Sequence, residues 1–209
     1  MTPILSPNPS RSLGSIRRFL ALAAIPLLFA SASGSEDSAP TYVDEARLPE
    51  GWPAPGPYNQ VLEKKIPAYR AAFSEGGQGG AFWVLFEHIS RHDIPMTAPV
   101  EMALDESSAT TSMAFLYQNT EVGTAGADRH GVNVEDVPPA RVLSYTWQGP
   151  DTRQNREKAL AALKEALEDR GEEASSFRLL GYNGPRTPRA LATWEIHAIL
   201  SSDPQEQKP

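Results

Sequence analysis

The chain has 209 residues, a formal net charge of −7, 40% hydrophobic residues and no cysteine. This length and composition are typical of one globular domain, and the negative charge argues against nucleic acid as a partner, because phosphate binding needs a basic face. The absence of cysteine excludes disulfides, a Cys nucleophile, thiolate ligation of a metal or haem, and covalent c-type attachment of haem.

Residues 1–32 have the layout of a secretory signal peptide. Arg17 and Arg18 precede an apolar run over residues 19–30, and Ala30-Ser31-Ala32 offers small residues for cleavage. The run is shorter than the roughly 20 residues that span a membrane. We expect a protein exported to the periplasm or secreted, with no membrane association after cleavage, and the alternative is an uncleaved anchor.

Residues 33–57 are rich in proline and polar residues. Such a segment buries too little apolar surface to offset the entropy lost on ordering. We interpret it as a linker that Trp52 can pin to the surface of a domain. That domain is expected at residues 58–200, followed by a polar tail at 201–209.

The apolar pattern of the domain predicts short strands and two helices. In chain order these are a strand region at 58–72 interrupted by Pro67, a Gly-rich loop at 76–80, a helix at 81–91, strands at 94–104, 111–118, 131–137 and 141–148, a helix from Asp151 or Thr152 to Gly171, and strands at 177–182 and 192–200. The order strand, helix, strand, strand occurs at 60–118 and again at 141–200, which predicts an α+β fold of two similar units.

The strand expected at 94–104 carries the most specific motif. Its prolines fall on the opposite parity to Met96 and Met102, so both methionines are expected to face one interior. The run Ile94-Pro95-Met96-Thr97-Ala98-Pro99-Val100 resembles the signature of the SOUL family of haem-binding proteins. The likeness covers residues 58–200 in outline and has motif-level detail only at 82–102 and 181–195.

The resemblance implies a distorted antiparallel β-barrel built from two strand-helix-strand-strand units, with two flanking helices. It also implies non-covalent, reversible binding of haem b or another tetrapyrrole in an apolar cleft. One branch of the family has a proposed axial histidine where this chain has Lys65-Ile66-Pro67, which argues against ligation at that place.

Two histidines are candidate ligands of a metal or of haem iron, which His, Met or Tyr can bind in a protein without cysteine. His88 and His92 are four residues apart, so they lie on one face of the expected helix and can share a metal ion. The alternative is a solvated His88 and a His92 favoured by the negative end of the helix dipole.

The resemblance further implies basic residues near the propionates and an apolar or aromatic lining. The candidates for these contacts are Lys64, Lys65, Arg70, Phe82, Phe86, Met96 and Met102. The alternative is that the basic residues are solvated surface charges and that the others are ordinary core residues.

Glu195 and His197 form a second candidate site, because residues two apart on a strand share a face. If this face is interior, burial should raise the pKa of Glu195 and allow acid–base chemistry or cation binding. The SOUL fold resembles the effector-binding domains of multidrug-sensing regulators, in which an interior Glu receives cations and in some relatives assists hydrolysis. A hydrolase or a binder of small cations is therefore the alternative function, unless Glu195 and His197 face water.

Overall fold

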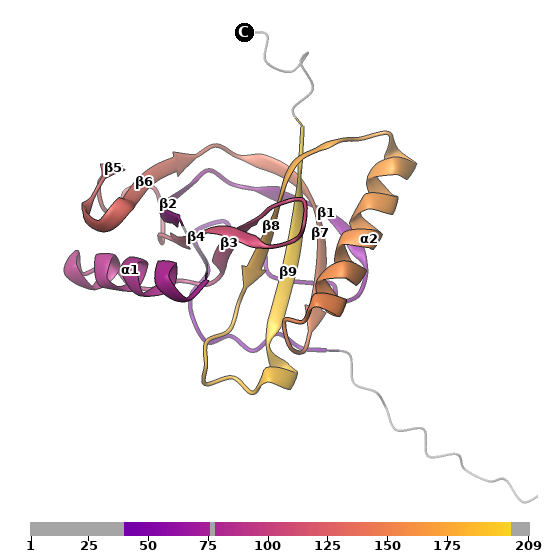
Figure 1. The fold of residues 1–209 in the computed structure, drawn as a ribbon, viewed down its shortest axis with the longest axis horizontal. Helices are drawn as coiled ribbons and strands as arrows, with labels where there is room; N and C mark the ends of the chain where they lie inside the picture. The colour runs from indigo at the N-terminus through magenta and orange to yellow at the C-terminus, as the bar shows by residue number, and fades with distance from the viewer. Residues whose placement is uncertain (1–39, 76–77, 202–209) are drawn as a thin grey trace, which may run out of the picture. The chain divides into compact units, whose positions relative to one another are not determined.

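The computed structural model describes residues 40–75 and 78–201, which form one antiparallel sheet and two α-helices (Figure 1). The strands are β1 Val61–Ile66, β2 Tyr69–Glu75, β3 Val100–Leu104, β4 Thr110–Leu116, β5 Gly126–Ala127, β6 Val132–Val137, β7 Ala140–Gln148, β8 Ala174–Gly181 and β9 Thr193–Leu200, and the helices are α1 Gln78–Arg91 and α2 Arg153–Arg170. In the described ranges, no helix is long and apolar enough to cross a membrane. The expected signal peptide at 1–32 lies outside these ranges.

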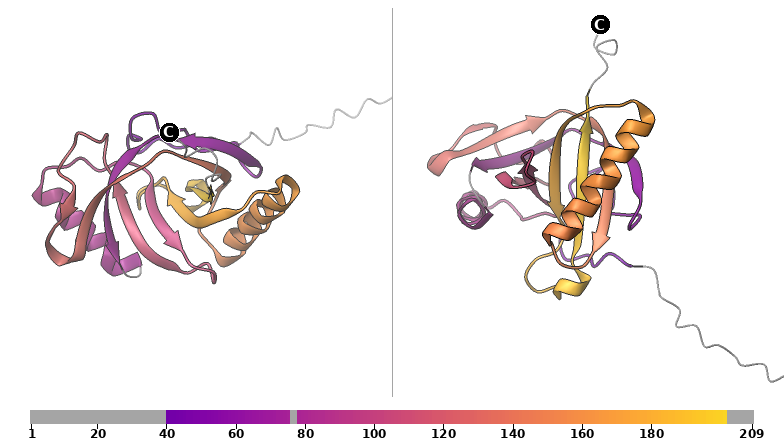
Figure 2. Two further views of the ribbon diagram at one scale, coloured as in Figure 1. Left: turned by 90° about the horizontal axis from the view of Figure 1, so that it is seen from above. Right: turned by 45° about the vertical axis from the view of Figure 1, so that its right-hand side comes forward.

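The sheet places its strands in the order β1-β7-β9-β8-β3-β4-β2-β6-β5. Five strands separate β1 from β2, yet only residues 67–68 join these two along the chain, so the sheet must curl strongly (Figure 2). No ladder pairing between described residues joins β1 to β2. An α+β fold with two helices is therefore confirmed, whereas closure into a barrel is not.

The helices cover the outer face of the curled sheet, at opposite ends of it (Figure 1). α1 packs on β2, β4 and β6, and α2 packs on β1, β7 and β9. Side chains alternate along the strands, as period-2 geometry requires. In β9, Ile196 and Ala198 join the core under the helices, whereas Glu195 and His197 point to the inner face.

Residues 40–57, expected to be a linker, pack on the inner face of the sheet. Tyr42, Leu48 and Trp52 belong to an apolar cluster with residues of β1, β2, β4, β7 and β8. Trp52 is 6% exposed, and the backbone N–H of Glu50 donates to the carbonyl of Gln118. A Pro-rich segment is thus ordered here because one large aromatic side chain fills a concave surface.

The most local sequence signals are confirmed with their bounds. Thr152 caps α2 by accepting a hydrogen bond from the N–H of Asn155, and Gly171 ends the helix at a left-handed φ of 63°. α1, in contrast, begins at Gln78 rather than residue 81, so Gly79 and Gly80 form its first turn instead of a loop.

The strand expected at 94–104 is shorter than predicted. β3 begins at Val100, because Pro95 and Pro99 lack the N–H that a ladder needs and residues 94–99 run outside the sheet. The expectation that both methionines face one interior is therefore wrong: Met102 is buried in the core, whereas Met96 is 40% exposed.

Candidate functional site

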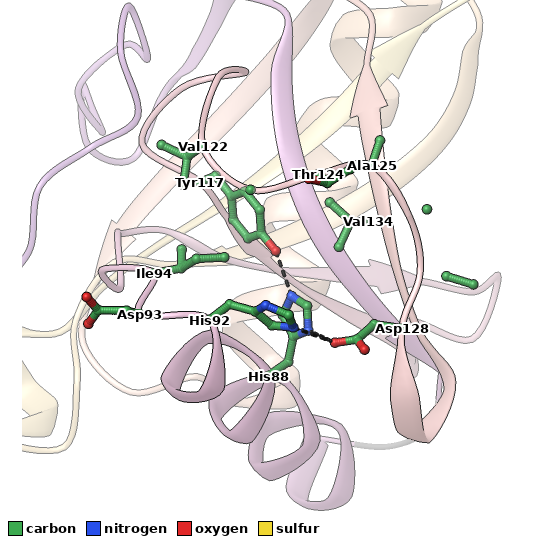
Figure 3. Close-up of a pocket in the computed structure, with 13 residues that line it drawn as sticks. His88, His92, Asp93, Ile94, Tyr117, Val122, Thr124, Ala125, Asp128 and Val134 are labelled. Carbon is green, nitrogen blue, oxygen red and sulfur yellow. Dashed lines mark hydrogen bonds and ion pairs between the residues drawn. The ribbon is translucent and has the colours of Figure 1, made fainter.

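A cavity lies between the C-terminal end of α1, the segment that follows β4, and β6 (Figure 3). Its volume is about 380 Å³. Its lining mixes apolar and polar residues, which are His88, His92, Asp93, Ile94, Tyr117, Val122, Gly123, Thr124, Ala125, Gly126, Ala127, Asp128 and Val134. We call this cavity the α1 cleft.

Four polar side chains converge at one wall of the α1 cleft. His88 lies on the last turn of α1 and His92 directly follows the helix, so the two face the same side, whereas Tyr117 follows β4 and Asp128 follows β5. Asp128 Oδ2 lies 2.6 Å from His88 Nδ1 and 2.9 Å from His92 Nε2. The second nitrogen of His88, Nε2, lies 2.7 Å from the Tyr117 hydroxyl, so the 3%-exposed His88 is held on both sides.

The charge of Asp128 decides the hydrogen positions in this group. Hydrogen bonds from the backbone N–H of Arg129 and from His92 and His88 hold the pKa of Asp128 well below its usual range. An ionised carboxylate only accepts hydrogen bonds, so the two histidine nitrogens that face it carry hydrogens. In the tautomer with its only hydrogen on Nδ1, His88 accepts a hydrogen bond at Nε2 from Tyr117, and burial raises the pKa of that hydroxyl to about 12.

Arg70 holds the segment that forms one side of the α1 cleft. Its guanidinium donates to the carbonyls of Val122 and Gly123 at 3.3 and 2.9 Å, and it pairs with both carboxylate oxygens of Asp136. Gly123 has φ of 66°, and a Cβ there would meet the Tyr117 ring at 2.9 Å. Arg70 is therefore placed to position the cleft rather than to point into it.

Other predicted contact residues do not line the α1 cleft. Phe82 and Phe86 lie on α1 with ring centroids 6.2 Å apart, and Phe82 meets Phe115 edge to face. Lys65 is exposed on β1, and the two methionines lie as described above. Of the residues expected to contact a tetrapyrrole, the structure brings only His88 and His92 into this cavity.

A second polar cluster lies on the inner face of the sheet, and it is built around Glu195, which is 0% exposed. Lys64 Nζ contacts Glu195 Oε1 at 2.5 Å, and the Tyr182 hydroxyl donates to Oε2 at 2.7 Å. His197 Nε2 lies 3.4 Å from Oε1, without hydrogen-bond geometry. The alternative in which Glu195 and His197 face water is therefore wrong.

Arg178 extends this inner cluster to a second ion pair. It donates to Tyr69 Oη at 2.6 Å and to Glu101 Oε2 at 3.0 Å, and it lies 3.3 Å from His197 Nδ1. The Trp52 ring covers the group. It stacks on His197, and its centroid lies 5.5 Å from Cζ of the Arg178 guanidinium. Two cations and two anions thus balance in a space that Trp52 closes.

The pKa of Glu195 moves opposite to our expectation. Burial alone would raise the pKa of this carboxyl, but the contacts with His197 and Lys64 outweigh burial and lower it. Glu195 is therefore ionised and paired near neutral pH. It is not a raised-pKa acid in its present surroundings.

Comparison with known proteins identifies the family. Residues 58–199, more than half of the chain, match the family described as SOUL heme-binding protein. The chain belongs to the SOUL family. A search of the curated proteins found no match.

Two solved structures show the same fold as this SOUL domain. The C-terminal domain of EcmrR is 16% identical with a TM-score of 0.52, and the match covers 69% of this chain and 98% of that one. A hydrolase from Listeria innocua is 10% identical with a TM-score of 0.55, with coverages of 70% and 94%. At these identities the likeness extends to the fold alone.

Sequence reasoning missed part of each cluster in the SOUL domain. Asp128 and Tyr117 lie far from α1 in sequence and belong to no motif. Arg178 lies on β8 and Tyr182 directly follows it. The pairing of β8 with β9 brings them beside Glu195 and His197, and no local sequence pattern reveals this. The one available signal was the resemblance of residues 181–195 to the end of the family's domain.

His197 predicts a pH dependence of stability. Burial lowers the pKa of this imidazole from 6.5, although Glu195 opposes the shift, and Lys64 and Arg178 face it as cations. Below pH 6.5 the unfolded chain binds a proton that the folded chain does not, so this contribution to stability falls as pH decreases. When the pH is lowered from 7.5 to 5.5, we expect the free energy of unfolding, measured with urea, to fall by about 1 kcal/mol more in the wild type than in His197→Gln.

The exposed His130, which has 61% of its side chain accessible, provides the control for this prediction. His130→Gln should keep the wild-type pH dependence. An equal loss in the wild type and in His197→Gln would show that His197 takes up a proton as readily in the folded state as in the unfolded state.

Proposed function

We propose that this SOUL domain binds haem b or a related tetrapyrrole reversibly and without a covalent bond, in the α1 cleft. The observation that carries the proposal is the donor set of this cavity. Two imidazoles and a phenol, which are side chains that bind haem iron, lie beside Ile94, Val122 and Val134. The volume of about 380 Å³ falls within the range of small-molecule pockets.

His92 is the residue proposed to face the iron. Its side chain is 47% exposed, whereas His88 is buried and bonded at both ring nitrogens. Arg91, whose side chain is 29% exposed, lies 3.1 Å from Asp128 in this group and is proposed to contact a propionate. A bound haem would supply its iron chemistry at this place, while the chain would supply the apolar walls and the axial nitrogen.

The inner face is the less favourable place for such a ligand. Trp52 fills it, and the Lys64 ammonium, expected near a propionate, is already paired with Glu195 and bonded to the carbonyl of Ala54. A hydrolase or cation-binding function at Glu195 stays a prediction. It requires Trp52 and the rest of residues 40–57 to move away from the inner face. Export, expected from residues 1–32, remains part of our proposal for where the protein acts.

A hemin titration of the full chain, followed by absorbance, tests the proposal. We expect saturable one-to-one binding, and a dissociation constant at least tenfold larger, with a changed Soret band, in His92→Ala. His130→Ala is the matched control and should titrate like the wild type, because His130 lies outside the cleft lining. Unsaturable binding, or equal binding by all three proteins, would contradict the proposed site.

A further inference from the structure

The convergence of His88, His92 and Asp128 allows an inference that needs no macrocycle. One ligand atom of each residue lies within 4.8 Å of the other two. His88 Nδ1 and His92 Nε2 both contact the same oxygen, Asp128 Oδ2. We propose that these three side chains bind a free divalent transition-metal ion such as Zn²⁺.

The distances require only a small rearrangement. Ligands at about 2.0–2.2 Å from a tetrahedral Zn²⁺ lie roughly 3.3 Å from one another. The present contacts to the Asp128 oxygen are 2.6 and 2.9 Å, so these two pairs must open by less than about 1 Å. The ligand atoms of the two histidines lie within 4.8 Å of each other and must approach to about 3.3 Å. His92 and Asp128 are partly exposed and can move, whereas His88 is fixed by its burial.

The surroundings of His88 suit a metal ligand. When Nδ1 of His88 binds a metal, the imidazole hydrogen is on Nε2 instead. This Nε2–H can donate a hydrogen bond to the Tyr117 oxygen, which lies 2.7 Å away. A metal-binding histidine usually has such an outer partner, which fixes its tautomer. The same Tyr117 contact thus serves both states of the histidine.

Charge and access are consistent with a cation site. The Asp128 carboxylate can supply one negative charge, while the Arg91 guanidinium, 3.1 Å from the same oxygen, has to give up this contact. Two imidazoles and one carboxylate would leave a fourth position on a tetrahedral ion for water or a small ligand, and all three residues line the α1 cleft. Imidazole favours Zn²⁺, Cu²⁺ and Ni²⁺ over Mg²⁺ and Ca²⁺, which prefer oxygen ligands.

Titration of the full chain with Co²⁺, followed by the visible d–d absorption and by displacement with Zn²⁺, tests the site. We expect one Co²⁺ per chain that Zn²⁺ displaces. His92→Ala and Asp128→Asn should each weaken binding at least tenfold, and Tyr117→Phe should weaken it about 10–100-fold through the outer partner. His130→Ala should bind within about twofold of the wild type.

The outcomes separate this site from the proposed function. Asp128→Asn removes the anionic ligand but keeps His92, so it should lose Zn²⁺ while still binding hemin. Failure of hemin binding with Zn²⁺ binding intact would reject the tetrapyrrole proposal alone. If the wild type shows no saturable Co²⁺ or Zn²⁺ binding, or if His92→Ala and Asp128→Asn bind as the wild type does, the metal site is wrong.

Discussion

Lys64→Met is expected to lower the free energy of unfolding by about 3–5 kcal/mol, because it leaves the ionised Glu195 buried without its cation. Lys64 is 6% exposed and Glu195 is 0% exposed, and their contact measures 2.5 Å. The hydroxyl of Tyr182 would remain as a donor, but it carries no charge to balance the carboxylate. Chemical denaturation at pH 7 measures the loss.

Two further variants test the cause of this loss. Lys65→Met is the matched control, because Lys65 is the exposed neighbour on the same strand, and its change should stay within about 0.5 kcal/mol. Lys64→Met combined with Glu195→Gln should recover part of the lost stability, since no unpaired charge remains. A loss for Lys64→Met no larger than that of the control would contradict the ion pair.

Trp52→Ala is expected to cost about 3–5 kcal/mol, as for other buried large aromatics. The ring stacks on His197, meets Tyr69 edge to face and lies against Arg178, and its Nε1 donates to the Tyr182 hydroxyl at 3.4 Å. Removing it leaves a cavity over a group of buried charges. The loss therefore combines fewer apolar contacts with water entering the cluster.

Trp83→Ala provides the comparison. Trp83 on α1 is 67% exposed, so this substitution should lower the free energy of unfolding far less than Trp52→Ala does. Thermal and urea unfolding of both variants measure the difference. Similar small losses in Trp52→Ala and Trp83→Ala would mean that residues 40–57 do not close the inner face in solution. In that case Glu195 would be open to ligands, and the alternative function would gain support.

The elements that sequence predicted well are those specified by neighbouring residues. The amphipathic stripe of α2, its Thr152 cap and its Gly171 end need no tertiary information, so its bounds agree with the structure. The stretch at 94–99 failed because alternation alone cannot outweigh two prolines. Apolar spacing there looked like a strand, while the missing N–H groups kept the backbone out of the sheet.

The orientation of Glu195 could not be decided from its own strand. β9 lies between β7 and β8, with α2 on one face and residues 42–57 on the other, so both of its faces are buried. Alternation of apolar and polar residues along a strand normally indicates that the polar face is exposed to solvent. In β9 the polar face is interior instead. The counter-charges that make this possible, Lys64 and Arg178, come from β1 and β8.

The sequence predicted the two histidines of the α1 cleft but not their partner Asp128. Helical spacing placed His88 and His92 on one face, as a local pattern can. The partner Asp128 lies in the loop between β5 and β6, and no local rule brings that loop to α1. It arrives there because β6 pairs with β2, which α1 also covers.

The central claim is that the α1 cleft, rather than the inner face, receives the tetrapyrrole. An NMR titration of the full chain with gallium protoporphyrin IX, a diamagnetic analogue of hemin, locates the ligand directly. We predict the largest amide shift changes at residues 88–94 and 117–128, with little change at residues 42–57. Changes concentrated at 42–57 and along β9 would place the ligand on the inner face and contradict the proposed site.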